Sequence, residues 1–204
     1  MELIPTQEEV IELLRETGAL REGLFEYPNG LYSTRHIQMP LAFRNYRHMK
    51  ILSVALSRLV RRDSELRASL DDLSVVAPAT GGMPVAYGIC EALHARRVYW
   101  AERENEDEPL RFRQFVEQER GEKVLLVDDM LRSGSKMREL KSLCESHGAN
   151  VMGVAVVVFQ PNRGMPDFGD IPFFYLAKME ATFKSADDTF TGFQPGMMPT
   201  RIWV

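Results

Sequence analysis

Apolar residues near the N-terminus recur at helical intervals. Val10, Leu13 and Leu14 follow the stretch Thr6-Gln-Glu-Glu9, which has the spacing of a capping box, and Gly18 closes the segment. Residues 47–62 repeat the helical spacing with a broader apolar face. The segment between them, residues 25–38, is rich in turn formers, and Asn29-Gly30 is typical of a hairpin turn. The pattern predicts two helices joined by a turn-rich connection.

From residue 73 onward, short apolar runs alternate with helical patterns. The runs predict strands at 73–77, 97–101, 123–127, 151–159 and 171–176. Residues 110–116 are a further candidate strand. Helical patterns lie between them at 84–94 and 136–147. This alternation predicts an α/β fold with a parallel, doubly wound sheet covered by helices on both faces. We expect a single domain over residues 1–204, with roughly 1–45 and 165–204 forming a small hood or other peripheral elements.

Composition narrows the class of protein. A formal net charge of −4 gives no electrostatic reason to expect nucleic acid as a partner. No apolar run reaches the roughly 18 residues that would span a membrane, and the acidic N-terminal residues do not resemble a signal peptide. The two cysteines fall in helical patterns, which favours reduced thiols, and the four histidines lack metal-ligand spacing. We therefore expect a cytoplasmic protein.

Two adjacent carboxylates, Asp128 and Asp129, end the apolar run 124–127. In an open parallel sheet, ligands bind beyond the carboxyl ends of the strands. Residues 132–136 then lead into a helix N-terminus, where free N–H groups favour an anion. Carboxylates that accept hydrogen bonds from vicinal hydroxyls, next to an anion-binding loop, suit a sugar phosphate.

Three other interpretations of the acid pair are open. A Walker B strand would need G-x-x-x-x-G-K-[ST] upstream, and the sequence has no such string. The phospho-acceptor acid of a signalling domain lies in a fold of the same topology, but an anion-binding loop does not usually follow it directly. The acids could also simply solvate a strand end.

The stretch VLLVDDMLRSGSKM, residues 124–137, resembles the phosphoribosyl pyrophosphate (PRPP) motif of type I phosphoribosyltransferases. Residues 14–20, 25–35, 77–84 and 101–104 are similar, in the same order, to segments of orotate phosphoribosyltransferases in particular. The resemblance implies transfer of ribose 5-phosphate from PRPP to a base, orotate first among them, with release of pyrophosphate. It also implies Mg²⁺, carried by PRPP and water, and a homodimer.

The resemblance assigns roles to individual residues. Asp128 and Asp129 would hold the ribose 2′- and 3′-hydroxyls and, with Arg103, act in catalysis. The PRPP-binding residues would be those two acids together with Met130, Leu131, Arg132, Ser133, Gly134, Ser135, Lys136, Ala79, Thr80, Gly81 and Gly82. The last four resemble the loop that binds pyrophosphate.

The sequence departs from the family at three places. Asp107 stands near the position of a loop lysine that neutralises pyrophosphate, although Arg111 and Arg113 follow closely. Gln160 occupies the position of the arginine that binds the orotate carboxylate, with Arg163 three residues on.

The third departure is Arg132, which stands where the family's phosphate loop usually has threonine. The candidate base-binding residues are Arg132, Gln160 and Arg35. Two alternatives stay open: a non-catalytic PRPP- or nucleotide-binding protein, and a phosphoribosyltransferase for a different base.

Overall fold

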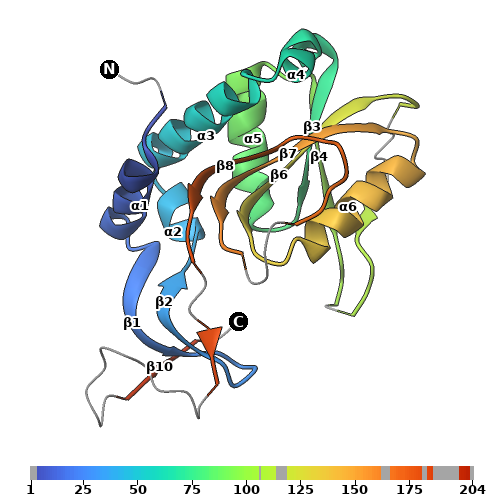
Figure 1. The fold of residues 1–204 in the computed structure, drawn as a ribbon. Helices are drawn as coiled ribbons and strands as arrows, with labels where there is room; N and C mark the ends of the chain where they lie inside the picture. Colours follow the sequence, from blue (N-terminus) through green and yellow to red (C-terminus); the bar gives the residue numbers. More distant parts are fainter. Residues whose placement is uncertain are drawn as a thin grey trace.

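The protein is described here from a computed structural model. The structure describes residues 4–105, 107–113, 119–161, 166–180, 183–185 and 198–202. A large sheet lies between two layers of helices, and a smaller sheet extends from one end of it (Figure 1). None of the helices within these ranges is long and apolar enough to cross a membrane.

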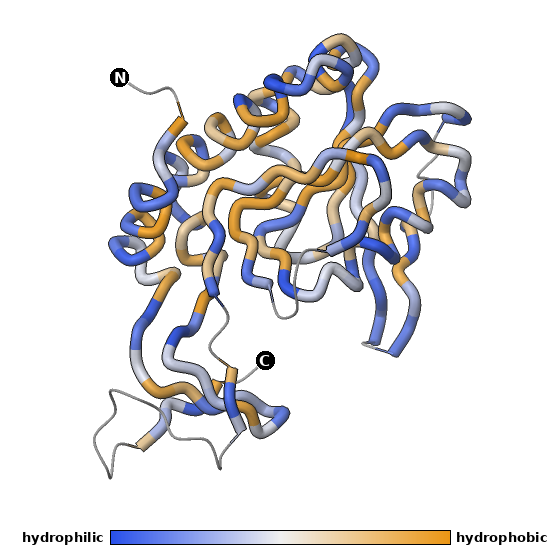
Figure 2. The backbone as a smooth tube through the Cα atoms, in the orientation of Figure 1, coloured by the Kyte–Doolittle hydropathy of each residue, from blue (hydrophilic) through white to orange (hydrophobic). Residues whose placement is uncertain are grey.

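The main sheet has six strands in the order β5-β4-β3-β6-β7-β8. The strands are β3 (Leu73–Pro78), β4 (Arg97–Glu102), β5 (Arg111–Phe112), β6 (Lys123–Leu131), β7 (Asn150–Phe159) and β8 (Phe173–Lys178). Every pairing is parallel except that of β4 with β5. The apolar residues concentrate along the central strands (Figure 2), as expected when both faces of a parallel sheet are buried.

Helices cover both faces of this sheet, which confirms the predicted architecture. The helices are α1 (Gln7–Glu16), α2 (Pro40–Phe43), α3 (Tyr46–Val60), α4 (Ser64–Ala68), α5 (Gly82–Leu93) and α6 (Ser135–Ser146). One core cluster joins α1, α3 and α5 to the sheet, and a second joins α6 to the other face. Thr6 caps α1 through the predicted capping box.

The smaller sheet combines the two ends of the chain. Its order is β10-β1-β2-β9, where β1 (Leu20–Glu26) and β2 (Tyr32–Ile37) form a hairpin. Gly30 has a φ of +77° in the turn, as the Asn-Gly signal predicted. The other two strands, β9 (Phe183–Lys184) and β10 (Thr200–Arg201), add to the hairpin from the C-terminal segment.

The strand expected at residues 110–116 differs from the prediction. Only Arg111–Phe112 form a strand among the described residues there, and they pair antiparallel with β4. Residues 114–118 lie outside the described part of the chain. β4 and β5 therefore form an antiparallel hairpin at the edge of the sheet, and no parallel crossover connects them.

Candidate functional site

The acid pair, Asp128 and Asp129, meets the glycine loop, residues 79–82, at the carboxyl ends of β6 and β3. These strands are neighbours, so their ends share one edge of the sheet. A Cβ atom added to Gly81 would lie 2.7 Å from Asp129 Oδ2, and one added to Gly82 would lie 3.0 Å from Asp128 Oδ1. The absence of side chains at the two glycines therefore makes room for the two carboxylates. Two motifs about 50 residues apart in the sequence are therefore in contact.

Burial sets the protonation of the acids. The Asp128 residue is 9% exposed, and burial followed by the charge of Asp129 raises the pKa of its carboxyl well above its usual range. Burial also raises the pKa of Asp129. The charge of Lys136 opposes both shifts. A hydrogen-bond donor or a cation at this site would therefore stabilise the two carboxyl groups as anions.

The loop between β6 and α6 turns at Gly134, which has a φ of +74°. Ser133 Oγ lies 2.8 Å from Ser135 Oγ and accepts a hydrogen bond from the Ser135 N–H at 3.3 Å. The first N–H groups of α6, a helix of 12 residues, face this loop as an anion site would require. Met130 and Leu131 still belong to β6; Leu131 is buried in one hydrophobic core, and the half-buried Met130 packs against the other.

Arg103 lines a common hollow of about 460 Å³ with Ala79 and Thr80, the first two residues of the loop 79–82. Its lining comprises Ala79, Thr80, Met83, Trp100, Glu102, Arg103 and Arg113. Arg113 pairs with Glu102. Arg111 instead lines an adjoining hollow, together with Arg103 and Arg113. The structure thus brings Arg103 and the nearby Arg113 to the loop that was predicted to bind pyrophosphate, while Asp107 is exposed and lines neither hollow.

Glu139 is a functional candidate that the sequence did not reveal. One carboxylate oxygen pairs with Arg103 Nη2 at 2.5 Å, and the other accepts a hydrogen bond from the Leu110 N–H at 2.6 Å. Glu139 therefore ties both ends of the acidic β4–β5 loop to α6. Its position on α6 carries no motif that would predict a partner on a distant loop.

The three candidate base-binding residues are not all brought together. Gln160 follows β7 and donates its backbone N–H to the carbonyl of Leu131 at 2.8 Å, which places it beside Arg132. Arg35 lies on β2, and because side chains alternate along a strand, it occupies the opposite face from His36. Arg163 lies outside the described residues.

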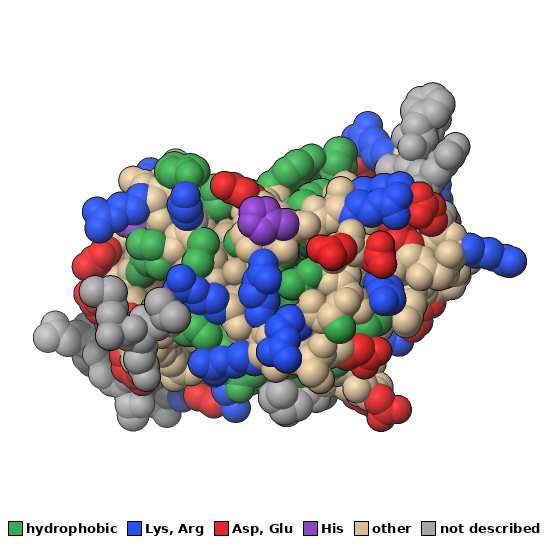
Figure 3. All heavy atoms as spheres, turned by 90° about the horizontal axis from the view of Figure 1, so that it is seen from above, with side chains coloured by type: hydrophobic (Ala, Val, Ile, Leu, Met, Phe, Trp, Pro, Cys, Tyr) green, Lys and Arg blue, Asp and Glu red, His purple; other side chains and the backbone are tan. Residues whose placement is uncertain are grey.

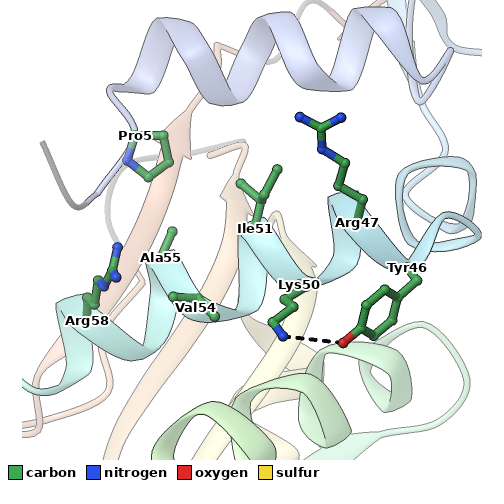
Figure 4. A pocket seen from close by; sticks show the side chains of 8 residues that line it. All are labelled: Pro5, Tyr46, Arg47, Lys50, Ile51, Val54, Ala55 and Arg58. Atoms are coloured by element: carbon green, nitrogen blue, oxygen red, sulfur yellow. Dashed lines mark hydrogen bonds between the residues drawn. The ribbon is translucent and has the colours of Figure 1, made fainter. Parts of the chain in front are cut away.

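A separate hollow of about 420 Å³ lies on the outer side of α3 (Figure 4). Tyr46, Ile51 and Val54 supply its apolar floor, and Lys50 and Arg58 stand among the basic residues around it. Figure 3 shows Lys and Arg side chains gathered across the face seen from above. None of the predicted site residues lines this groove.

No group of three or more His, Cys, Asp or Glu side chains within the described ranges has the arrangement of a metal site. The oxygen donors at the strand ends are the paired carboxylates of Asp128 and Asp129, which are hard ligands of the kind that Mg²⁺ accepts. Two carboxylates leave most of an octahedral shell to water and substrate. The donor set therefore fits a metal ion that arrives on a phosphate ligand.

Comparison with known proteins identifies the family. Residues 50–176 match the model of the phosphoribosyl transferase domain. The chain is 33% identical over 177 residues to the orotate phosphoribosyltransferase of Thermotoga maritima, covering 87% of this chain and 88% of that protein. It is 34% identical over 175 residues to the orotate phosphoribosyltransferase of Heliobacterium modesticaldum, covering 86% of each.

The fold agrees with these matches. The crystal structure of orotate phosphoribosyltransferase from Aeropyrum pernix superposes with a TM-score of 0.65 at 18% identity, covering 83% of this chain and 93% of that one. The matched residues 50–176 include the glycine loop, the acid pair and the start of α6. The chain belongs to the phosphoribosyltransferase family.

Proposed function

We propose that the protein transfers ribose 5-phosphate from PRPP to a base and releases pyrophosphate, with orotate as the first candidate base. The observation that carries the proposal is the contact between the Gly81-Gly82 loop and the Asp128-Asp129 pair. A ligand bound there would touch hydroxyl acceptors, an anion loop and a glycine loop at once. PRPP carries a diol, a 5′-phosphate and a diphosphate in this arrangement.

Each group then has a chemical task. Asp128 and Asp129 accept hydrogen bonds from the ribose hydroxyls and stabilise positive charge that develops on the ring. The bond between the anomeric carbon and the pyrophosphate oxygen breaks, and its electron pair leaves with pyrophosphate. A base nitrogen forms the new bond, and its proton passes to pyrophosphate or to water. The Ala79 N–H donates to the Ala101 carbonyl, so the backbone amides of residues 80–82 are left for the leaving group, and Arg103 offsets the charge that accumulates on it.

Mg²⁺ fits this scheme as part of the substrate. Bound to the diphosphate, it would neutralise negative charge on the leaving group. Asp129, whose carboxylate lies against the glycine loop, is the residue best placed to reach a metal on the diphosphate directly or through water. The remaining ligands would be substrate oxygens and water.

Orotate is favoured because both relatives described above carry it in their names. The arginine expected to bind its carboxylate is replaced by Gln160, so another cation must serve if orotate is the base.

A homodimer is part of the proposal. The outer faces of α3 and α5 expose the apolar side chains of Tyr46, Ile51 and Tyr87. The groove around Ile51 is ringed by basic residues, whereas the β4–β5 loop exposes acids. Opposite charges on one chain favour contact between two copies. Sedimentation should give a dimer for the wild type and a monomer for Tyr87→Glu; a monomeric wild type would remove this part of the proposal.

The alternative is a protein that binds PRPP without turning it over. It is favoured by one observation, the pairing of Arg103 with Glu139 beside an acidic loop. The deciding experiment follows pyrophosphate release with Mg²⁺, PRPP and orotate, and measures PRPP affinity in parallel. Release that is lost in Asp128→Asn/Asp129→Asn supports the transferase. PRPP binding without release for any pyrimidine or purine base supports the alternative.

A further inference from the structure

Arg132 reaches from the phosphate loop toward the smaller sheet. Its guanidinium lies over the ring of Phe183, 5.2 Å from the centroid. Its charge also contributes to lowering the pKa of His36, after burial, and opposes the effect of burial on the pKa of Tyr27. The side chain therefore faces the hairpin of the small sheet as well as the loop that carries it.

The residues around this guanidinium form an aromatic cluster. Tyr27 Oη lies 3.0 Å from His36 Nδ1, and the rings of Tyr27 and Phe183 are 5.3 Å apart. The ring of Phe25 is tilted against that of His36, with a centroid distance of 5.5 Å. Flat side chains and a cation in one place are suited to a flat, anionic ring.

Gln160 lies beside Arg132 because β6 and β7 end in register. Leu131 pairs with Phe159, and the next residues are Arg132 and Gln160. Gln160 is 2% exposed, and its Oε1 atom has no hydrogen-bond partner among the described residues. The buried Nε of Arg132 also has no hydrogen-bond partner among the described residues. A buried donor and a buried acceptor without partners each cost free energy, and a ligand that carries a matching acceptor and donor relieves both costs.

We propose that Arg132 is the specificity-determining residue of the base site: it binds a carboxylate on a planar base, while Gln160 pairs with the amide edge of the same ring. This assignment rests on the proposed function and explains how the chain retains a carboxylate-bearing base without an arginine at position 160. The cation comes from the phosphate loop, one strand away. A guanidinium can bind a carboxylate through two parallel hydrogen bonds, which a glutamine cannot.

The test compares two nucleotides that differ only in the carboxylate. Calorimetry measures the affinities of orotidine 5′-monophosphate and uridine 5′-monophosphate for the wild type, Arg132→Thr, Arg132→Lys and the control Arg62→Gln. Arg62 is an exposed cation beyond the end of α3, so its variant matches the change in net charge. We expect the wild type to prefer the carboxylated nucleotide by roughly 10- to 100-fold, as a charge-assisted pair would give.

Arg132→Thr should abolish this preference, Arg132→Lys should restore part of it, and Arg62→Gln should keep it. Gln160→Leu should weaken both nucleotides equally, because both carry the amide edge. A wild type without preference overturns the inference, and so does equal weakening of both nucleotides by Arg132→Thr, which would assign the guanidinium to the phosphate. The affinity ratio does not need turnover, so a failure of the transferase assay alone would count against the proposed function and leave this result intact.

Discussion

Replacing Gly81 by alanine isolates the contact between the glycine loop and the acid pair. Gly81 has φ −61° and ψ −38°, a conformation that alanine adopts without strain. The added methyl group would meet Asp129 Oδ2 at 2.7 Å, where ordinary contacts begin at 3.4 Å. The perturbation therefore acts on one carboxylate and leaves the backbone unstrained.

Two opposing effects determine how much Gly81→Ala changes the free energy of unfolding. Removing a glycine at a compatible position stabilises a protein by about 0.4–1 kcal/mol, because the unfolded chain loses freedom. Overpacking costs about 1–3 kcal/mol when the neighbour cannot move. The atom met here is the end of a side chain, so we expect Asp129 to turn away and stability to change by less than about 1 kcal/mol. PRPP affinity should then fall roughly 10- to 100-fold, because the carboxylate no longer reaches the ribose hydroxyl or the metal on the diphosphate.

Calorimetric titration with Mg²⁺-PRPP and thermal unfolding of the ligand-free protein measure the two quantities separately. The matched control is Gly88→Ala, whose methyl group would overlap Ser53 Oγ between α5 and α3, away from the site. The control should lose stability and keep its affinity for PRPP. If Gly81→Ala bound PRPP like the wild type, the apposition of Gly81 and Asp129 would have no part in binding, and the reasoning from this contact would be refuted.

Three further predictions test other parts of the site. Gly134→Ala forces a left-handed backbone on alanine and should lower both stability, by about 1–2 kcal/mol, and affinity for inorganic phosphate. Gly121→Ala is the control, because Gly121 has a φ of +77° with open space around it. This variant should lose stability but keep its phosphate affinity, so the phosphate affinities of the two variants should differ. Glu139→Ala should accelerate amide hydrogen exchange in the β4–β5 loop roughly tenfold or more, whereas Glu145→Ala on the exposed side of α6 should not; equal exchange would show that the clamp is weak.

Asp128→Asn is expected to stabilise the ligand-free protein by about 1–2 kcal/mol at pH 8. Burial raises the pKa of this carboxyl, so the folded state holds its proton more tightly than the unfolded state does. Wild-type stability must then fall as pH rises from the usual aspartate range through the raised value, and the asparagine lacks this loss. Thermal unfolding across a pH series checks the sign; a variant less stable than the wild type at pH 8 would contradict it.

The parallel core was predictable because both signals that define it are local. The apolar runs at 73–77, 123–127 and 151–159 are long enough to read as buried strands, and each is followed by turn residues or a helix. The candidate strand at 110–116 contains β5, but its antiparallel direction could not be predicted in the same way. Only two residues pair there, and an antiparallel pairing with β4 depends on where the loop returns. Such a pairing has no periodicity of its own.

The site likewise has parts that the sequence predicts and parts that it does not. The acid pair and the loop around Gly134 are contiguous motifs, and their chemistry is visible in the sequence. The contact of Gly81 with Asp129 and the clamp from Glu139 to Arg103 join residues that are 36 or more positions apart. The gathering of Arg132 with His36 and Phe183 depends on two chain ends meeting in the smaller sheet. Contacts of this kind arise from tertiary packing, which leaves no spacing pattern to detect.

Burial decides what the two acids are for. If Asp128 and Asp129 only solvated a strand end, they would stand in water and keep ordinary pKa values. Instead Asp128 is 9% exposed, both pKa values are raised, and two glycines leave the space that the carboxylates occupy. Burying two neighbouring acids costs a folded protein free energy unless a partner compensates their charge. Hydroxyl donors and a metal-bearing diphosphate would relieve the cost, and this supports the proposed PRPP site over the interpretation of a solvated strand end.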